Sequence, residues 1–232
     1  MNRNSNVYTV MYAAVMVIVV AAVLAFTALG LRPAQDKNVR IEKQRQLLSS
    51  INIESTAATA SELYSTYIPS SFVLNAEGQK VEGEDAFNIE VSQYYKLEPS
   101  KRLLPVFEAS IDGSKKYILP MYGDGLWGPI WGYLAVDSDG DSIYGAVFAH
   151  KGETAGLGAE IAKPDFSDQY KGKTLFQNNE FTSVAVSKAG QVDKNRDNID
   201  AISGGTITSV AVQEMMYNCV APYAKFLESL KK

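Results

Sequence analysis

A group of hydroxyl side chains and glycines stands near the C-terminal end of the chain, in the segment DNIDAISGGTITSVAV at 197–212. Ser203, Thr206, Thr208 and Ser209 supply the hydroxyls, and a helix is predicted to follow them. The free N–H groups and the dipole at a helix N-terminus favour an anion such as phosphate. By themselves, these residues indicate either an anion site or an ordinary capped loop.

The chain offers little else for nucleophilic or metal chemistry. No His, Lys or Cys lies within 197–212 to activate a serine, so hydrolase chemistry has little support. The single Cys219 lies in an apolar helical context, and the single His150 ends a predicted strand. Both are interpreted as structural side chains, and we expect no zinc site and no Cys-ligated cluster.

Two further segments are rich in glycine, YGDGLWGPIWGY at 122–133 and HKGETAGLGAEI at 150–161. Neither matches the phosphate-binding glycine motifs of nucleotide-binding enzymes. Their glycines let the backbone approach a flat ligand, and Tyr122, Trp127, Trp131 and Leu157 can cover its faces. Composition alone favours the simpler interpretation, in which these glycines serve turns and bulges.

Length and charge narrow the classes of function. The 232 residues allow one sizeable domain with appendages. Asp and Glu outnumber Lys and Arg by 26 to 22, which gives a formal net charge of -4. The absence of a basic face argues against a nucleic-acid partner.

Near the N-terminus, residues 4–31 carry no charged side chain. The run VMYAAVMVIVVAAVLAFTALGL matches the roughly 20 apolar residues that cross a bilayer as a helix. A cleavable signal peptide has a shorter apolar stretch of about 7 to 15 residues. We therefore interpret this segment as an uncleaved membrane anchor. Only Arg3 precedes it and five cations follow it by residue 45, so the positive-inside rule places the bulk of the chain in the cytoplasm.

The sequence pattern divides the chain into three predicted parts. These are a membrane anchor at 1–32, a helical stalk at 33–68 and a folded domain at 69–232. Strand signals dominate from Ser71 to about Ser187, separated by Gly, Asp and Asn. A calcium loop that starts at Asp137 needs Gly at its sixth position and Glu at its twelfth, where the chain has Ser142 and Phe148, so the segment DSDGDS is predicted to be a turn. The fold class is therefore α+β, a mostly antiparallel sheet with flanking helices, preceded by one transmembrane helix.

The last helix is predicted from about Thr208 to Leu230, with Pro222 marking a break. Thr208 or Ser209 is expected to cap its first turn through the side-chain oxygen.

The sequence resembles a known family, the C subunits of the sodium-translocating NADH:quinone reductase. The resemblance covers nearly the whole chain and is carried by LGLRPAQDKN, KQRQLL, LPMYGDGLWGPIWGYLAV, GETAGLGAEI and DAISGGTITS. The last segment resembles the family's flavinylation motif, Asp-x-x-Ser/Thr-Gly-Ala-Thr. The resemblance implies that the final Thr carries FMN through a phosphoester bond, made by a separate flavin transferase that uses FAD.

Position by position, Asp200 stands for the acid of that motif, Ser203 and Gly204 match it, and Thr206 is the implied FMN acceptor. Gly205 replaces the usual Ala, and we expect this change to loosen the loop and to affect recognition by the transferase.

The resemblance also implies a flavin pocket built from several loops. The remaining residues of this implied pocket are Glu153, Thr154, Gly156, Leu157, Gly158, Tyr122, Leu126, Trp127, Thr208 and Ser209.

The implied function is electron transfer in a membrane complex with other subunits. In the family, electrons from NADH pass through FAD and iron–sulfur centres to this FMN, then to a second covalent FMN, riboflavin and ubiquinone, while sodium moves outward. The predicted membrane helix has no charged residue, so we expect other subunits to conduct the ion. The family's flavin domain faces the periplasm, and on orientation we follow the resemblance over the charge count. Two alternatives stay open: the homologous FMN subunit of an Rnf-type ferredoxin:NAD oxidoreductase, and a membrane-anchored binding or assembly module without flavin.

Overall fold

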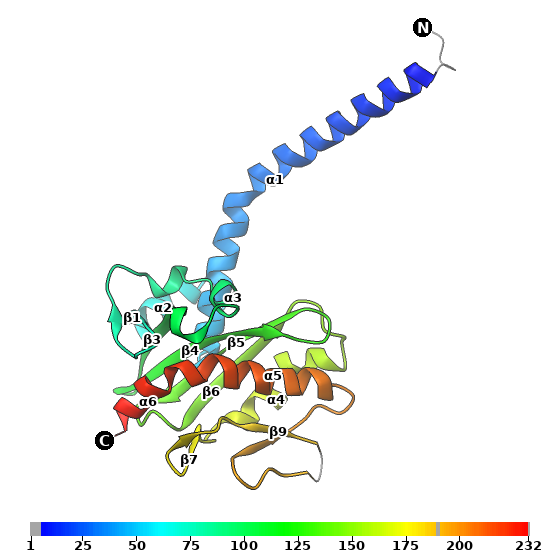
Figure 1. Cartoon of the computed structure of the whole chain (residues 1–232). Helices are drawn as coiled ribbons and strands as arrows, with labels where there is room; N and C mark the ends of the chain where they lie inside the picture. The colour runs from blue at the N-terminus through cyan, green and yellow to red at the C-terminus, as the bar shows by residue number, and fades with distance from the viewer. Residues whose placement is uncertain (1–5, 189–190, 232) are drawn as a thin grey trace. The chain divides into compact units, whose positions relative to one another are not determined.

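The computed structural model describes residues 6–188 and 191–231, which form two units, Met1–Lys43 and Gln44–Lys232. Helix α1 (Asn6–Ser50) supplies nearly all of the first unit, and most of its apolar side chains there are exposed. Within the described residues it is the one helix that is long and apolar enough to cross a membrane (Figure 1). The helix continues through Pro33.

The second unit is built on a six-stranded sheet with the order β2-β1-β3-β4-β5-β6, in which every pairing is antiparallel. This confirms the predicted α+β class. The six strands are β1 (Ser70–Leu74), β2 (Lys80–Val81), β3 (Leu104–Ile111), β4 (Ser114–Asp124), β5 (Pro129–Asp137) and β6 (Ile143–His150).

Short helices and two small sheets complete this unit. The α-helices are α2 (Ala60–Tyr67), α3 (Val91–Tyr94), α4 (Pro164–Ser167), α5 (Thr206–Val220) and α6 (Ala224–Leu230). The 3-10 helices are η1 (Ala86–Asn88), η2 (Pro99–Lys101), η3 (Gly158–Ala162), η4 (Asp168–Tyr170) and η5 (Ala221–Tyr223). The small sheets pair β7 (Phe176–Gln177) with β8 (Glu180–Phe181), and β9 (Ala185–Ser187) with β10 (Asn198–Asp200).

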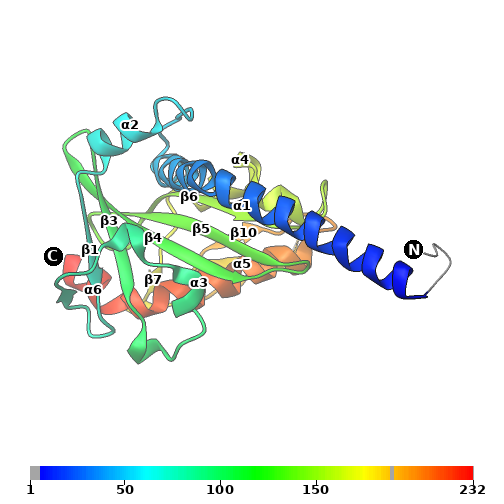
Figure 2. The ribbon, with the colours of Figure 1, turned by 90° about the horizontal axis from the view of Figure 1, so that it is seen from above.

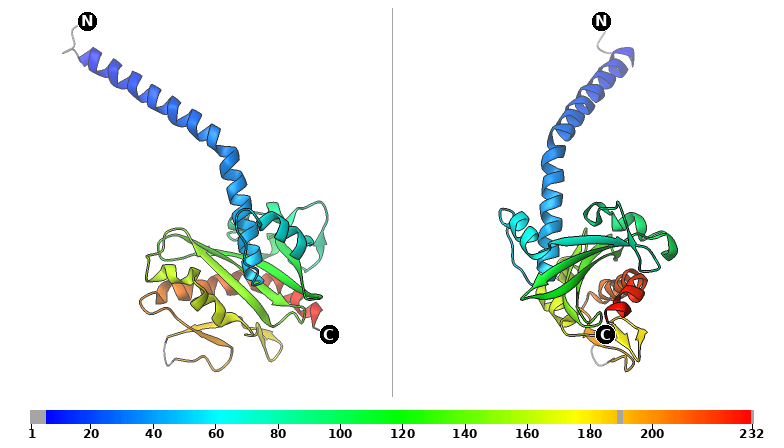
Figure 3. Two further views of the ribbon diagram at one scale, coloured as in Figure 1. Left: turned by 180° about the vertical axis from the view of Figure 1, so that it is seen from behind. Right: turned by 90° about the vertical axis from the view of Figure 1, so that its left-hand side faces the viewer.

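The large sheet has a hydrophobic core on each face, because successive side chains of a strand point to opposite sides. Leu119 and Leu134 pack on the face that α5 and α6 cover, while Ile118 and Ala135 pack on the other. Figures 2 and 3 show α5 and α6, in orange and red, lying along one face of the strands.

The second core includes residues that the sequence pattern assigned to the stalk. Leu47 and Leu48 in the last turn of α1, together with Ile51, are fully buried there. The folded unit therefore begins at Gln44, whereas the sequence pattern places its start at residue 69. The apolar side chains of Leu47, Leu48 and Ile51 are buried in this core, whereas on a solvated stalk they would be exposed to water.

The predicted cap of the last helix is wrong. Helix α5 begins at Thr206 with Gly205 at the N-cap, and no side chain caps it. Thr208 and Ser209 lie inside the first turn and are buried, and their hydroxyls donate to Glu153 Oε2 and to the Gly205 carbonyl. The break predicted at Pro222 is present as η5, between α5 and α6.

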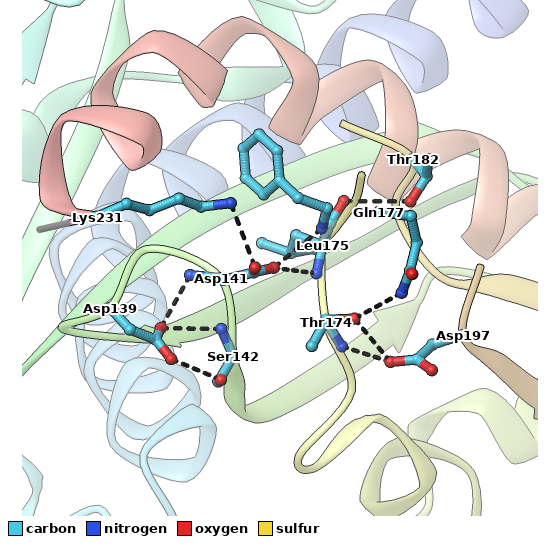
Figure 4. A network of polar contacts seen from close by, with 10 residues as sticks. Asp139, Asp141, Ser142, Thr174, Leu175, Gln177, Thr182, Asp197 and Lys231 are labelled. Atoms are coloured by element: carbon cyan, nitrogen blue, oxygen red, sulfur yellow. Dashed lines mark hydrogen bonds and ion pairs between the residues drawn. The ribbon is translucent and has the colours of Figure 1, made fainter. Parts of the chain in front are cut away.

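The segment DSDGDS forms the β5–β6 turn, as predicted, and its carboxylates are used as acceptors within the fold (Figure 4). Asp139 accepts from the backbone N–H groups of Asp141 and Ser142 and from the Ser142 hydroxyl. Burial raises the pKa of Asp139, but these hydrogen bonds outweigh it and hold the pKa below its ordinary value.

Asp141 fastens this turn to the start of β7. One oxygen, Oδ1, accepts from the N–H groups of Leu175 and Phe176, each at 2.9 Å. The other, Oδ2, pairs with Lys231 Nζ at 3.2 Å, as Figure 4 shows. The turn, a small sheet and the C-terminal end of the chain are therefore tied through one carboxylate.

We expect Asp141→Ala to lower the free energy of unfolding by about 2 kcal/mol, because it leaves the partly buried N–H of Phe176 without its acceptor. Lys231→Met is the matched control. It keeps the acceptor of the Phe176 N–H and removes a partly exposed ion pair and the contact of Lys231 Nζ with the Phe176 ring, which together contribute about 1 kcal/mol. Urea denaturation of the full-length protein in detergent measures both. Equal losses in the two variants would contradict the role given to Asp141.

Candidate functional site

Three segments that are far apart in sequence enclose a cleft of about 160 Å³ at the N-terminal end of α5. They are the β4–β5 loop, the loop that follows β6, and the glycine segment that leads into α5. The cleft is lined by Leu126, Trp127, Glu153, Thr154, Leu157, Gly158, Gly204, Gly205, Thr206, Ile207 and Thr208.

Glycines let these segments approach one another closely. A Cβ atom on Gly125 would lie 2.5 Å from Glu153 Oε1, and one on Gly158 would lie 2.5 Å from Glu153 Oε2. A Cβ on Gly205 would lie 3.0 Å from the carbonyl carbon and oxygen of Leu157. Side chains at these positions would push the segments apart.

Glu153 joins the three segments. Its carboxylate is buried, with 7% of the residue exposed. Oε1 accepts from the backbone N–H of Trp127 at 2.9 Å, and Oε2 accepts from the hydroxyl of Thr208 at 2.8 Å. Its own N–H donates to His150 Nδ1 at 3.2 Å, so His150 has a structural contact here.

The first turn of α5 presents backbone donors to the cleft. Gly205 provides no capping side chain, and within the described residues no protein acceptor takes the N–H groups of Thr206 and Ile207. Free N–H groups at the positive end of a helix dipole favour a phosphate. Thr206, a half-buried residue, lines the same cleft.

The rim of the cleft is apolar and exposed. Trp127 is 68% exposed and Ile207 is 64% exposed, and Leu126 and Leu157 are exposed beside them. Such side chains suit one face of a flat ring. The volume lies below the range of roughly 300–1,000 Å³ that encloses most of a drug-sized ligand. The cleft therefore fits a phosphate and part of a flat ring, and leaves the rest of such a ligand uncovered.

The structure brings most of the sequence-predicted pocket residues together, but not all of them. Tyr122 lies outside the cleft, where its ring contacts Tyr95 and its N–H meets Cys219 Sγ. The residues Asp200, Ser203, Gly156 and Ser209 do not line the cleft.

Their positions show what these residues do instead. Asp200 and Ser203 are exposed, and Gly156 has a positive φ of 76° in a turn, with its N–H bonded to Glu160. Ser209 is buried and its hydroxyl also accepts from the N–H of Ile202.

Ile207 is a cleft residue that the sequence analysis missed. The sequence did contain a signal for Ile207. It is an apolar residue between hydroxyl residues at the start of a helix, where no hydrophobic core is expected to bury it.

The described residues contain no group of three or more His, Cys, Asp or Glu that is placed to hold a metal ion. Cys219 is buried, as predicted, and burial raises the pKa of its thiol to about 11.

Comparison with known proteins adds to this geometry. A family model described as "FMN-binding domain" matches residues 125–221, which include all the cleft segments. The sequence is 30% identical over 230 residues to the C subunit of the Na(+)-translocating NADH-quinone reductase of Haemophilus ducreyi, covering 91% of this chain and 88% of that one.

Two solved structures share the fold. A crystal structure of the C subunit of the same reductase from Parabacteroides distasonis has a TM-score of 0.80 and 48% sequence identity, and covers 85% of this chain and 96% of that chain. The NqrC structure of Shewanella oneidensis has a TM-score of 0.69 and 26% identity, and covers 83% of this chain and 97% of that chain.

The fold, the cleft and the family model define an FMN-binding domain that follows a candidate membrane anchor. Sequence identity over nearly the full length of the relatives shows which family of FMN-binding proteins this is. The chain belongs to the family of C subunits of the Na+-translocating NADH-quinone reductase, and it is therefore part of an oxidoreductase.

Gly205→Ala tests how closely the cleft segments must approach. Gly205 is buried, and a Cβ at this position would come within about 3 Å of Ile202 and Leu157, so a side chain has little room there. We expect Gly205→Ala to cost about 1–2 kcal/mol of unfolding free energy in urea denaturation.

Gly152→Ala is the control in the same loop region. A Cβ there would meet only the Trp127 carbonyl at 3.7 Å, and we expect a change within about 0.5 kcal/mol. A Gly205→Ala protein as stable as the wild type would show that the approach to Leu157 is not a constraint.

Proposed function

We propose that this chain relays electrons in a membrane Na+-translocating NADH:ubiquinone reductase through an FMN joined to Thr206 by a phosphoester bond. The observation that carries the proposal is the position of Thr206. This residue lines the cleft and begins α5, where the N–H groups of Thr206 and Ile207 have no acceptor among the described residues, and the apolar rim belongs to the same cleft.

The neighbouring hydroxyls are less suited to be the acceptor. Those of Thr208 and Ser209 are buried and already bonded, to Glu153 and to Gly205. Ser203 is exposed but lies outside the cleft. Among the described residues, Thr206 has no hydrogen-bond partner for its hydroxyl, which leaves that group available.

Attachment requires a flavin transferase and FAD. An O–P bond forms at Thr206 Oγ1, the pyrophosphate bond of FAD breaks, AMP leaves and the hydroxyl proton is released. The free N–H groups of the first turn of α5 would hold the phosphate, and Trp127 and its apolar neighbours would face the ring. When bound, FMN supplies the capacity to take up and release electrons.

The partners of this function are the other subunits of the same complex and the membrane. The named relatives, all C subunits of the Na(+)-translocating NADH-quinone reductase, favour this assignment over an Rnf-type protein. Helix α1 has no charged side chain across its apolar run, which supports ion conduction by other subunits. The inner membrane of a bacterium, with the flavin domain in the periplasm, is the proposed location.

Thr206→Val tests the tether. Valine has the shape of threonine without the hydroxyl, and the residue is only half-buried, so the protein should fold and stay colourless after co-expression with the flavin transferase. Flavin absorbance of the denatured, washed protein measures covalent attachment. Thr206→Ser keeps a hydroxyl and should retain flavin, and Ser203→Ala should also retain it. Covalent flavin in Thr206→Val would rule out this tether.

Protease protection tests the orientation. If the flavin domain lies in the periplasm, protease added to intact spheroplasts should digest residues 44–232. A cytoplasmic control protein should survive in the same sample. A domain that stays intact until the cells are lysed would place it in the cytoplasm, as the charge count around the membrane helix predicts.

A further inference from the structure

Glu153 is the one residue with a formal charge among the described residues that line the cleft. The other lining residues are glycines, threonines and apolar side chains. Among the described residues no Lys or Arg forms an ion pair with Glu153, although ion pairs occur elsewhere in this unit. The cleft therefore has a carboxylate in its wall with no paired cation.

The position of this carboxylate is fixed from two sides. The backbone of Trp127 donates to one oxygen and the side chain of Thr208 donates to the other. Gly125 and Gly158 leave no free space beside the two oxygens. The positive end of the α5 dipole lies close by and favours an acidic group at this place. A buried group held in this way cannot swing into solvent, where water would screen its charge.

We propose that Glu153 is a positioning residue whose fixed negative charge lowers the electron affinity of a flavin bound in this cleft. The inference rests on the proposed function, since it needs FMN on Thr206. Adding an electron beside a fixed negative charge costs free energy, and the cost is larger in a partly buried site than in water. The midpoint potential of the flavin is therefore more negative with Glu153 than without its charge.

Glu153→Gln separates the charge from the hydrogen bonds. The amide oxygen of glutamine can accept from the Trp127 N–H, and its NH₂ group can donate to Thr208 Oγ1. Both hydrogen bonds of the Glu153 side chain, with Trp127 and with Thr208, are then kept while the charge is lost. Thr208→Val is the matched control, because it removes one hydrogen bond and leaves both the charge and the contact with Trp127.

The experiment is a redox titration, followed by flavin absorbance, of full-length protein purified in detergent after co-expression with the flavin transferase. Mass spectrometry first confirms that each variant carries FMN on Thr206. We expect Glu153→Gln to shift the midpoint potential in the positive direction, and Thr208→Val to shift it much less. An unchanged potential in flavin-loaded Glu153→Gln, or equal shifts in both variants, would overturn the inference while leaving the tether at Thr206 intact.

A second pair of variants tests the effect of charge on the flavin without changing Glu153 or its hydrogen bonds. Thr154 lines the cleft and is exposed, so Thr154→Glu and Thr154→Gln differ only in a charge at the rim. The Glu variant should have the more negative potential of the two. Thr154 is exposed, so water and salt screen its charge more than that of Glu153, and the pair is compared at low ionic strength. A Thr154→Glu protein whose potential is equal to or more positive than that of Thr154→Gln under these conditions would refute the inference, even if Glu153→Gln does not fold. A wild-type protein without FMN on Thr206 would instead refute the proposed function.

Discussion

The bridge that Glu153 makes between the Trp127 N–H and the Thr208 hydroxyl is the contact on which the site depends. It brings together a β-hairpin loop, a loop that follows β6 and the first turn of α5. A buried carboxylate is stable in such a place only when donors surround it. The close approach in turn requires glycine on either side of the carboxylate, at positions 125 and 158.

The rest of the folded unit serves to hold that bridge rigidly. Strands β4, β5 and β6 pair over most of their lengths and end beside the two loops of the cleft. Helix α5 packs on β4 through Met215, whose side chain meets Gly123, so its N-terminus has a defined position. At the other end of the sheet, Asp141 ties the β5–β6 turn to the start of β7 and to Lys231. A cleft on rigid elements suits a carrier, since a bound group then keeps one geometry.

Local patterns in the sequence were enough for the architecture. Strand-forming segments separated by Gly, Asp and Asn predicted a mostly antiparallel sheet, and the uncharged run at 4–31 predicted the anchor helix. Long-range contacts were not readable in the same way. Thr208 has the composition of a cap, but its partner Glu153 is 55 positions away. Tyr122 adjoins the Gly-Leu-Trp loop in sequence, yet its strand carries it toward Cys219 instead. The candidate acceptor, Thr206, came from resemblance to a motif, and its role stays a proposal.

The proposed function depends on one hydroxyl, that of Thr206, as the point of attachment of the flavin. Fragment-ion mapping of the tryptic peptide 197–225, from wild-type protein matured with the flavin transferase, tests it most directly, because Ser203, Thr206, Thr208 and Ser209 all lie in that one peptide. We expect a mass increase of FMN less one water that is confined to fragments containing Thr206. The same adduct on Ser203 or Thr208, or a peptide that never gains it, would contradict attachment at Thr206.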